Sequence, residues 1–167
     1  MKVFKETQRF TQTWFIVLMA ISLIVPLILI IKEYLKEDSD FTTKGFVLTL
    51  SVLILSIAPI FFFKLITRID EKGIHYQFFP FHFKNKIISW QEINSAYVRT
   101  YDPIGEYGGW GLKGGFLWNK SKGTAINVSG DIGIQLELKK GKKILIGTQK
   151  KQEAKNALQT YINKDIL

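Results

Sequence analysis

The chain reads WFIVLMAISLIVPLILII from Trp14 to Ile31 and FVLTLSVLILSIAPIFFF from Phe46 to Phe63. Each stretch runs eighteen residues without a charged side chain. As a helix, each would be ~27 Å long, which is close to the hydrocarbon thickness of a bilayer. The only polar side chains are hydroxyls, which can bond to the backbone of their own helix: Ser22, Thr49, Ser51 and Ser56. The two stretches therefore predict transmembrane helices rather than buried core helices.

The flanking residues set the expected boundaries of a two-helix hairpin. Trp14 opens the first stretch and Lys32 and Tyr34 close it, as interfacial anchors do. The first stretch is also longer than the apolar region of a signal peptide, and no small-residue cleavage site follows it. We predict a tail over 1–13, transmembrane helices over 14–35 and 44–66, and a short external connector over 36–43.

Basic residues favour one orientation of this hairpin. The chain carries 23 Lys and Arg against 14 Asp and Glu, a net charge of +9. The tail holds three basic residues, the segment Lys32–Gly45 between the two apolar stretches holds three more, and Lys64, Arg68 and Lys72 follow the second stretch. The excess of Lys and Arg beside the spans lies on the side of the two termini, so the positive-inside rule favours cytoplasmic termini. We therefore expect a multi-pass protein of the cell (inner) membrane with both termini in the cytoplasm.

From residue 67 to 167 the pattern changes to that of a β domain. Ile74, Tyr76 and Phe78 alternate with polar neighbours, and so do Ile134, Leu136 and Leu138. Lys140 and Gly141 predict a tight hairpin turn. A closing helix over about 149–163, capped by Thr148, is predicted from one apolar stripe: Ala154, Ala157, Leu158, Tyr161 and Ile162. The fold class is membrane-anchored α+β.

Three blocks in this part carry a family resemblance: TRIDEKGI at Thr67–Ile74, ISWQEI at Ile88–Ile93 and YGGWG at Tyr107–Gly111. Together with the closing hairpin and helix, they resemble the bacterial pleckstrin-homology-like (PH-like) domains that are fused to two-helix membrane anchors. The resemblance implies a seven-stranded bent sheet or open barrel with a C-terminal helix at one end. It implies no enzyme activity.

Two segments are candidate interaction sites. Tyr107, Trp110, Phe116 and Trp118 lie in a glycine-rich segment and form a possible recognition loop, or they pack on the end of the domain. Lys139, Lys140, Lys142 and Lys143 flank the predicted turn. These lysines either contact anionic lipid, or they are solvated charges that prevent aggregation through the edge of the sheet.

No residue pattern points to catalysis or to metal binding. The only histidines, His75 and His82, are expected on opposite faces of one extended run, and there is no cysteine. Carboxylates are scattered singly, and Ser129 lacks a nucleophile-elbow context. We expect no enzyme activity, no cofactor and no nucleic-acid partner.

The expected function is that of a non-catalytic membrane protein whose PH-like domain is a membrane-tethered protein-interaction module. Anionic-lipid sensing by the basic domain is one alternative, and an accessory role in a membrane enzyme or transporter is another. The expected partners are the lipid bilayer and an unknown protein. Small residues in the second stretch also suit pairing with another copy of the chain: Gly45, Thr49, Ser51, Ser56 and Ala58.

Overall fold

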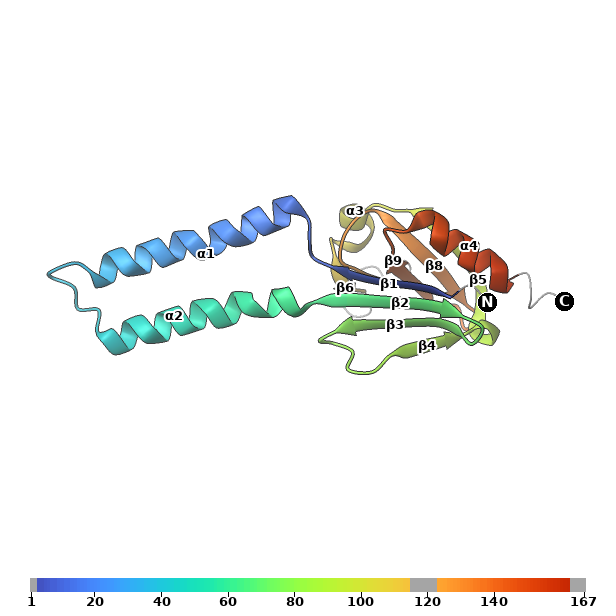
Figure 1. The fold of residues 1–167 in the computed structure, drawn as a ribbon, viewed down its shortest axis with the longest axis horizontal. Coiled ribbons are helices and arrows are strands. Elements are labelled where there is room, and N and C mark those ends of the chain that lie inside the picture. Colours follow the sequence, from blue (N-terminus) through green and yellow to red (C-terminus); the bar gives the residue numbers. More distant parts are fainter. Residues whose placement is uncertain (1–2, 115–122, 163–167) are drawn as a thin grey trace. The chain divides into compact units, whose positions relative to one another are not determined.

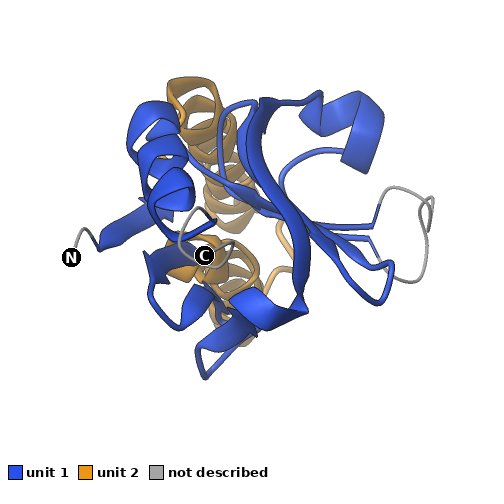
Figure 2. Ribbon diagram, turned by 90° about the vertical axis from the view of Figure 1, so that its right-hand side faces the viewer, with its two compact units in different colours: residues 1–9, 64–167 blue, residues 10–63 orange. Residues whose placement is uncertain are grey.

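A computed structural model describes residues 3–114 and 123–162 of the protein (Figure 1). The chain forms two compact units, shown in different colours in Figure 2. One unit comprises Met1–Arg9 together with Lys64–Leu167, and the other comprises Phe10–Phe63. The helical unit is thus an insertion within the chain of the sheet unit.

The inserted unit is a pair of helices, α1 (Thr13–Tyr34) and α2 (Thr43–Ile57), followed by a short 3-10 helix at Ala58–Phe62. Tyr34 stacks on Phe46 with ring centroids 4.3 Å apart. Both helical segments are long and apolar enough to cross a membrane, and none of their side chains is buried in the structure.

The hydroxyl groups of this unit bond to their own helix backbone, as the sequence predicted. Ser22 donates to the Met19 carbonyl at 2.9 Å, and Thr49 donates to the Gly45 carbonyl at the same distance. Ser51 and Ser56 do likewise, to Val47 and Leu53. These four hydroxyls therefore need no polar partner outside their own helix, whereas the hydroxyls of Tyr34 and Thr43 bond to each other between the two helices at 3.1 Å.

The predicted end of the second helix at residue 66 is wrong. The α-helix stops at Ile57, immediately before the Ala58–Phe62 segment that contains Pro59. Proline lacks an amide hydrogen and cannot continue the backbone hydrogen bonds of an α-helix, so the change in helix type falls at this point. Strand β2 (Lys64–Asp70) starts two residues after the 3-10 helix.

The predicted N-terminal tail over 1–13 is also wrong, because β1 (Phe4–Arg9) is a strand. It pairs antiparallel with β2, from Phe4 opposite Ile69 to Arg9 opposite Lys64. Its side chains alternate strictly between buried and exposed. The sheet unit therefore contains residues from both sides of the insertion and begins before residue 67.

Four strands form the first sheet, in the order β1-β2-β3-β4, with β3 at Gly73–Phe79 and β4 at Lys86–Ser89. All of its pairings are antiparallel. A 3-10 turn at Trp90–Glu92 then leads into the second sheet. Trp90 donates its indole N–H to the Asp70 carbonyl at 2.9 Å, so this turn is tied back to the end of β2.

The second sheet has the order β5-β8-β9-β7-β6. Its strands are β5 (Ile93–Thr100), β6 (Gly111–Lys113), β7 (Thr124–Asn127), β8 (Ile132–Leu138) and β9 (Lys143–Gly147). The predicted turn at Lys140 and Gly141 is confirmed, with Gly141 at a φ of 78°. The structure has two separate sheets where the resemblance implied a seven-stranded bent sheet or open barrel, and β7 pairs with β9 in parallel where antiparallel pairing was expected.

Helix α4 (Lys151–Ile162) closes the chain and confirms the predicted apolar stripe. Its buried residues are Ala154, Ala157, Leu158 and Tyr161. The predicted N-cap at Thr148 is wrong by two residues: the Lys150 carbonyl accepts the first helical hydrogen bond, from the Ala154 amide at 2.9 Å, and Thr148 accepts from the Lys150 amide ahead of the helix. The Tyr161 ring stacks on Trp90 at 5.7 Å, so the helix packs over the junction between the two sheets.

Strand β1 also contacts the start of this helix through two buried polar side chains. Glu6 accepts from the Thr148 hydroxyl at 2.6 Å and from the Gln149 amide at 2.9 Å. Gln8 donates to the Gly147 carbonyl at 2.7 Å. The N-terminal strand is therefore hydrogen-bonded both to the first sheet and to the β9–α4 connection.

Candidate functional site

The best-defined candidate site is an open polar pocket of about 420 Å³ on the second sheet. We call it the sheet pocket. Its lining comes from three neighbouring strands and from α3 (Pro103–Tyr107), a short helix between β5 and β6. The lining residues are Tyr97, Arg99, Glu106, Tyr107, Gln135, Glu137 and Lys143.

Arg99 is the most strongly held group in the sheet pocket. Its guanidinium binds the Glu106 carboxylate through two bonds, of 3.0 and 2.7 Å. It also donates to the Gln135 side-chain oxygen at 3.1 Å. The hydrogen bond to Glu106 raises the pKa of Arg99 above its ordinary value, against the opposing effect of burial. This cation is therefore fixed in place and permanently charged.

A second ion pair forms another part of the wall. Lys143 lies 3.6 Å from the Glu137 carboxylate, which also accepts from the Ser95 hydroxyl at 3.1 Å. Tyr97 is 44% exposed, so its ring is available to a binding partner. Each charged residue of the lining has an oppositely charged partner within it. The pocket thus presents fixed, balanced charge beside an aromatic surface, which suits polar recognition better than acid–base chemistry.

The local sequence explains why α3 forms and places Glu106 in this pocket. Asp102 caps the helix by accepting from the Ile104 amide at 3.0 Å, and Pro103 occupies the first turn. Glu106 reaches back to accept from the Asp102 amide at 3.0 Å. Gly108 ends the helix at a φ of 72°, where glycine is favoured. This helix was not predicted from the sequence, although Asp-Pro at its start and glycine at its end are typical helix boundary residues.

Two of the four aromatic residues predicted for the recognition loop, Tyr107 and Trp110, are held within the domain. The Tyr107 side chain is buried and lies 3.4 Å from Arg99, and Trp110 donates its indole N–H to the Gly130 carbonyl at 2.9 Å. This arrangement favours the packing alternative for both residues. Phe116 and Trp118 lie outside the described residues. Of the two aromatics that the structure describes, Tyr107 lines the sheet pocket.

The four predicted lysines are exposed around the β8–β9 turn. Lys143 reaches the sheet pocket, so the structure brings one residue of each predicted cluster together there, Tyr107 and Lys143. The Lys139 amide donates to the Glu92 carbonyl at 2.9 Å. Glu92 ends the 3-10 turn that follows β4, and Ser89, the last residue of β4, pairs with Gly73 at the β2–β3 turn. The lysine turn is therefore hydrogen-bonded beside the end of the first sheet at which β2 turns into β3. Lipid contact by these lysines stays a prediction.

A separate charged cluster surrounds Asp70 at the end of β2. Its carboxylate accepts from the Lys72 amide and lies 2.9 Å from both Arg68 and His75. Burial would raise the pKa of Asp70, but these hydrogen bonds and positive charges outweigh it and lower the pKa overall. His82 instead stacks edge-on against Tyr76. Among residues 3–114 and 123–162, no group of three His, Asp or Glu side chains is arranged to hold a metal ion.

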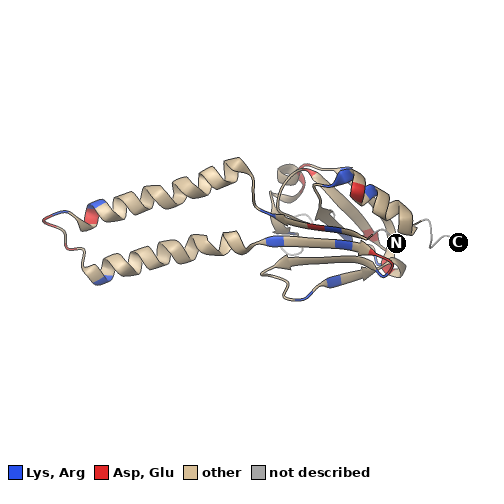
Figure 3. Cartoon of the chain, in the orientation of Figure 1, with Lys and Arg blue, Asp and Glu red and all other residues tan. Residues whose placement is uncertain are grey.

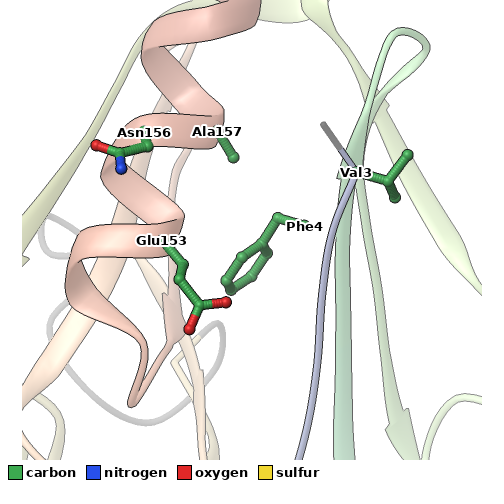
Figure 4. Close-up of a pocket in the computed structure, with 5 residues that line it drawn as sticks. All are labelled: Val3, Phe4, Glu153, Asn156 and Ala157. Carbon is green, nitrogen blue, oxygen red and sulfur yellow. The ribbon is translucent and has the colours of Figure 1, made fainter. Parts of the chain in front are cut away.

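A smaller groove of about 290 Å³ lies between β1 and α4 (Figure 4). The Phe4 ring points toward the helix, where Glu153 and Ala157 line the opposite wall, while Val3 points away from it. Phe4 is itself buried. The groove therefore looks like a packing seam between the strand and the helix, and it carries no convergent set of charged groups.

Comparison with known proteins adds no assignment to this geometry. No protein-family model matches the chain, and no curated protein or solved structure matches it.

Proposed function

We propose that this chain is a non-catalytic integral membrane protein whose sheet unit binds a protein partner beside the membrane. The hairpin of α1 and α2 is the anchor, and the two-sheet unit with its C-terminal helix is a PH-like interaction module. The two sheets and the closing helix are compatible with that family. The extra strands and the parallel β7–β9 pair depart from the expected pattern.

The proposal that the hairpin is a membrane anchor is supported by the insertion of the helical unit between two paired strands. Arg9 lies opposite Lys64 in the β1–β2 ladder, and the whole hairpin connects them. Because β1 and β2 belong to one sheet, both ends of a membrane-spanning hairpin must emerge on the same side. This argument is independent of any count of lysines. The excess of basic residues then favours the cytoplasmic side of the inner membrane.

The sheet pocket supports a protein as the partner. The Arg99–Glu106 ion pair is held by two hydrogen bonds before any partner arrives, so these side chains need little further ordering on binding. Arginine and tyrosine are the residue types that contribute most to protein interfaces. Paired charges beside an exposed Tyr97 fit a polar peptide surface better than a reacting small molecule.

Site-specific photocrosslinking in native membranes tests this proposal. A photoreactive phenylalanine analogue replaces Tyr97 in the full-length chain, and a control chain carries it at the exposed Lys151 of α4. We expect a discrete adduct from position 97 alone, weakened by Lys143→Ala at the rim of the pocket. An adduct at twice the mass of the chain would identify a second copy as the partner. The same adducts from both positions, or no adduct, would contradict the proposal.

A further inference from the structure

The loop between β3 and β4 exposes phenylalanine side chains that a water-soluble surface would be expected to bury. We call residues 80–85 the β3–β4 loop. Phe83 is 81% exposed and Phe81 is 58% exposed. Clustered exposed aromatics usually mark a contact site with another protein or with a membrane. Neither residue lines the sheet pocket, so that site does not account for their exposure.

This exposure belongs to a firmly held loop. Gln77 donates to the backbone carbonyls of His82 and Phe83, at 3.0 and 3.1 Å. The His82 amide donates to the Phe78 carbonyl at 2.8 Å. Phe83 packs edge-on against Phe79, with ring centroids 6.2 Å apart. The loop therefore presents its outer aromatic rings in a fixed arrangement.

Strand register places this loop beside the two connections to the helical hairpin. Phe79, the last residue of β3, pairs with Lys64, and Lys64 pairs with Arg9 on its other side. Lys64 is one peptide bond from Phe63, the last residue of the inserted unit, and Arg9 is one bond from Phe10. The covalent chain alone thus brings the loop to the end of the sheet at which the chain enters and leaves the hairpin.

The charge at this end has one sign. Lys84 and Lys86 follow the exposed phenylalanines, and no acidic residue occurs between Glu71 and Glu92. The Lys64 ammonium lies 5.5 Å from the centroid of the Phe79 ring. Figure 3 shows basic residues at the start of β2 and between β3 and β4. Aromatic rings with lysines beside them are the composition that suits the surface of an anionic bilayer.

We propose that the β3–β4 loop is a second membrane contact, in which Phe81 and Phe83 enter the bilayer interface while Lys84 and Lys86 bind phosphate groups of anionic lipids. This inference rests on the proposed membrane insertion of the hairpin. It moves the expected lipid contact from the β8–β9 lysines to the loop. The β8–β9 turn is instead hydrogen-bonded, through Lys139 and Glu92, near the opposite end of the first sheet, where β2 turns into β3. The seven residues of β2 separate that end from the β3–β4 loop by ~20 Å.

Spin labelling of the full-length chain tests this inference, because the protein has no cysteine of its own. Single labels are placed by Asn85→Cys in the loop, by Lys72→Cys in the β2–β3 turn, and by Ile24→Cys within α1. The first two positions are both exposed and lie at opposite ends of the same sheet. The protein is reconstituted in phosphatidylcholine vesicles with and without phosphatidylglycerol. Collision rates with oxygen and with a water-soluble nickel complex then report the depth of each label.

We expect the label at position 85 to be several-fold less accessible to nickel than the label at position 72. Anionic lipid should strengthen this protection, and Phe81→Ser with Phe83→Ser should abolish it. Those two side chains are exposed, so a folded protein is expected, and the unchanged label at position 72 serves as the check.

Failure of the anchor and failure of the loop contact give different results. A water-accessible label at position 24 would overturn the membrane-spanning hairpin itself. A lipid-exposed label at position 24 with equal nickel access at 72 and 85 would overturn the loop contact alone. Protection in native membranes but not in lipid vesicles would mean that a protein covers the loop, which also overturns the lipid contact. Protection that ignores anionic lipid would overturn the role of Lys84 and Lys86.

Discussion

Replacement of Glu6 by alanine tests whether the N-terminal strand is a structural part of the sheet unit. Glu6 is 6% exposed, and its carboxylate accepts hydrogen bonds from Thr148 and from the Gln149 amide. Its two partners lie more than 140 positions away in the sequence and immediately before α4. Glu6→Ala removes both bonds without changing the backbone of β1.

The expected loss follows from these contacts. A hydrogen bond to a charged group contributes ~1.5–3 kcal/mol, and a buried donor left without its acceptor costs a comparable amount. The negative charge near the start of α4 adds ~0.3–1 kcal/mol through the helix dipole. Because water can enter and satisfy part of the site, we expect a total loss of about 3 kcal/mol. For a domain of roughly a hundred residues, this corresponds to a fall in melting temperature on the order of 10 °C.

Thermal unfolding of the full-length protein in detergent provides the assay. Fluorescence of Trp90 and Trp110 reports the sheet unit, since both indoles are hydrogen-bonded within it. Thr7→Ala is the matched control, because Thr7 is the exposed neighbour on the same strand and should cost no more than ~0.5 kcal/mol. Equal melting temperatures for the two variants would refute the claim that β1 is tied to the β9–α4 connection.

Five further changes have expected outcomes. Gly73→Ala should destabilise the protein by more than ~2 kcal/mol in denaturant unfolding, because the new Cβ would lie 2.1 Å from the Ile88 carbonyl oxygen at a φ of 142°. Gly141→Ala, which faces open space, should cost only ~1 kcal/mol. Because the pKa of Asp70 is lowered in the folded protein, its carboxylate contributes stability above the ordinary value of 3.8, and this contribution is lost as pH falls through the lowered pKa. In melting curves recorded at successive pH values, Asp70→Asn should reduce this loss of stability at acidic pH. Burial raises the pKa of Tyr101 to about 12, so stability should fall as pH rises from about 10 toward 12. Burial also raises the pKa of Tyr76 and Tyr107, and Tyr101→Phe should remove the last tyrosine to ionise in an ultraviolet titration. Replacing Phe10–Phe63 by an Asn-Gly turn should give a soluble domain that keeps the β-rich circular dichroism of the sheet unit, and an unfolded product would contradict the β1–β2 register.

The sequence predicted the elements whose apolar pattern is regular, and it missed β1 for a physical reason. The helical hairpin, β8, β9 and α4 each show a continuous period of apolar residues. In β1 the inward positions hold Phe4, Glu6 and Gln8, two of which are polar. Glu6 and Gln8 are stable inside because they have distant partners in the β9–α4 connection: Thr148 donates to Glu6, and Gln8 donates to the Gly147 carbonyl. A pattern of hydrophobicity cannot reveal a strand whose buried face is polar.

The sheet pocket was predictable only in fragments. Tyr107 and Lys143 each belonged to a candidate cluster, but no local signal relates them, because β5 pairs with β8 across two intervening strands of sequence. Arg99 and Gln135 meet through that same pairing. Glu106 was set aside as an isolated carboxylate, although the cap at Asp102 and the glycine at position 108 frame the short helix that carries it. Such sites depend on which strands become neighbours, and strand neighbours are decided by the whole fold.

The place of the insertion also links the anchor to the stability of the sheet unit. Adjacent antiparallel strands are normally joined by a short turn, whereas here the whole segment Phe10–Phe63 separates β1 from β2. Closing a flexible loop of this length would carry an entropic cost that grows with the logarithm of its length. A folded hairpin lowers that cost, because its two helices contact each other, with Tyr34 stacked on Phe46, and the segment is not a flexible loop. Changes that splay α1 from α2 should therefore weaken β1, and with it the Glu6 contacts to the start of α4, although they touch no residue of the sheet unit.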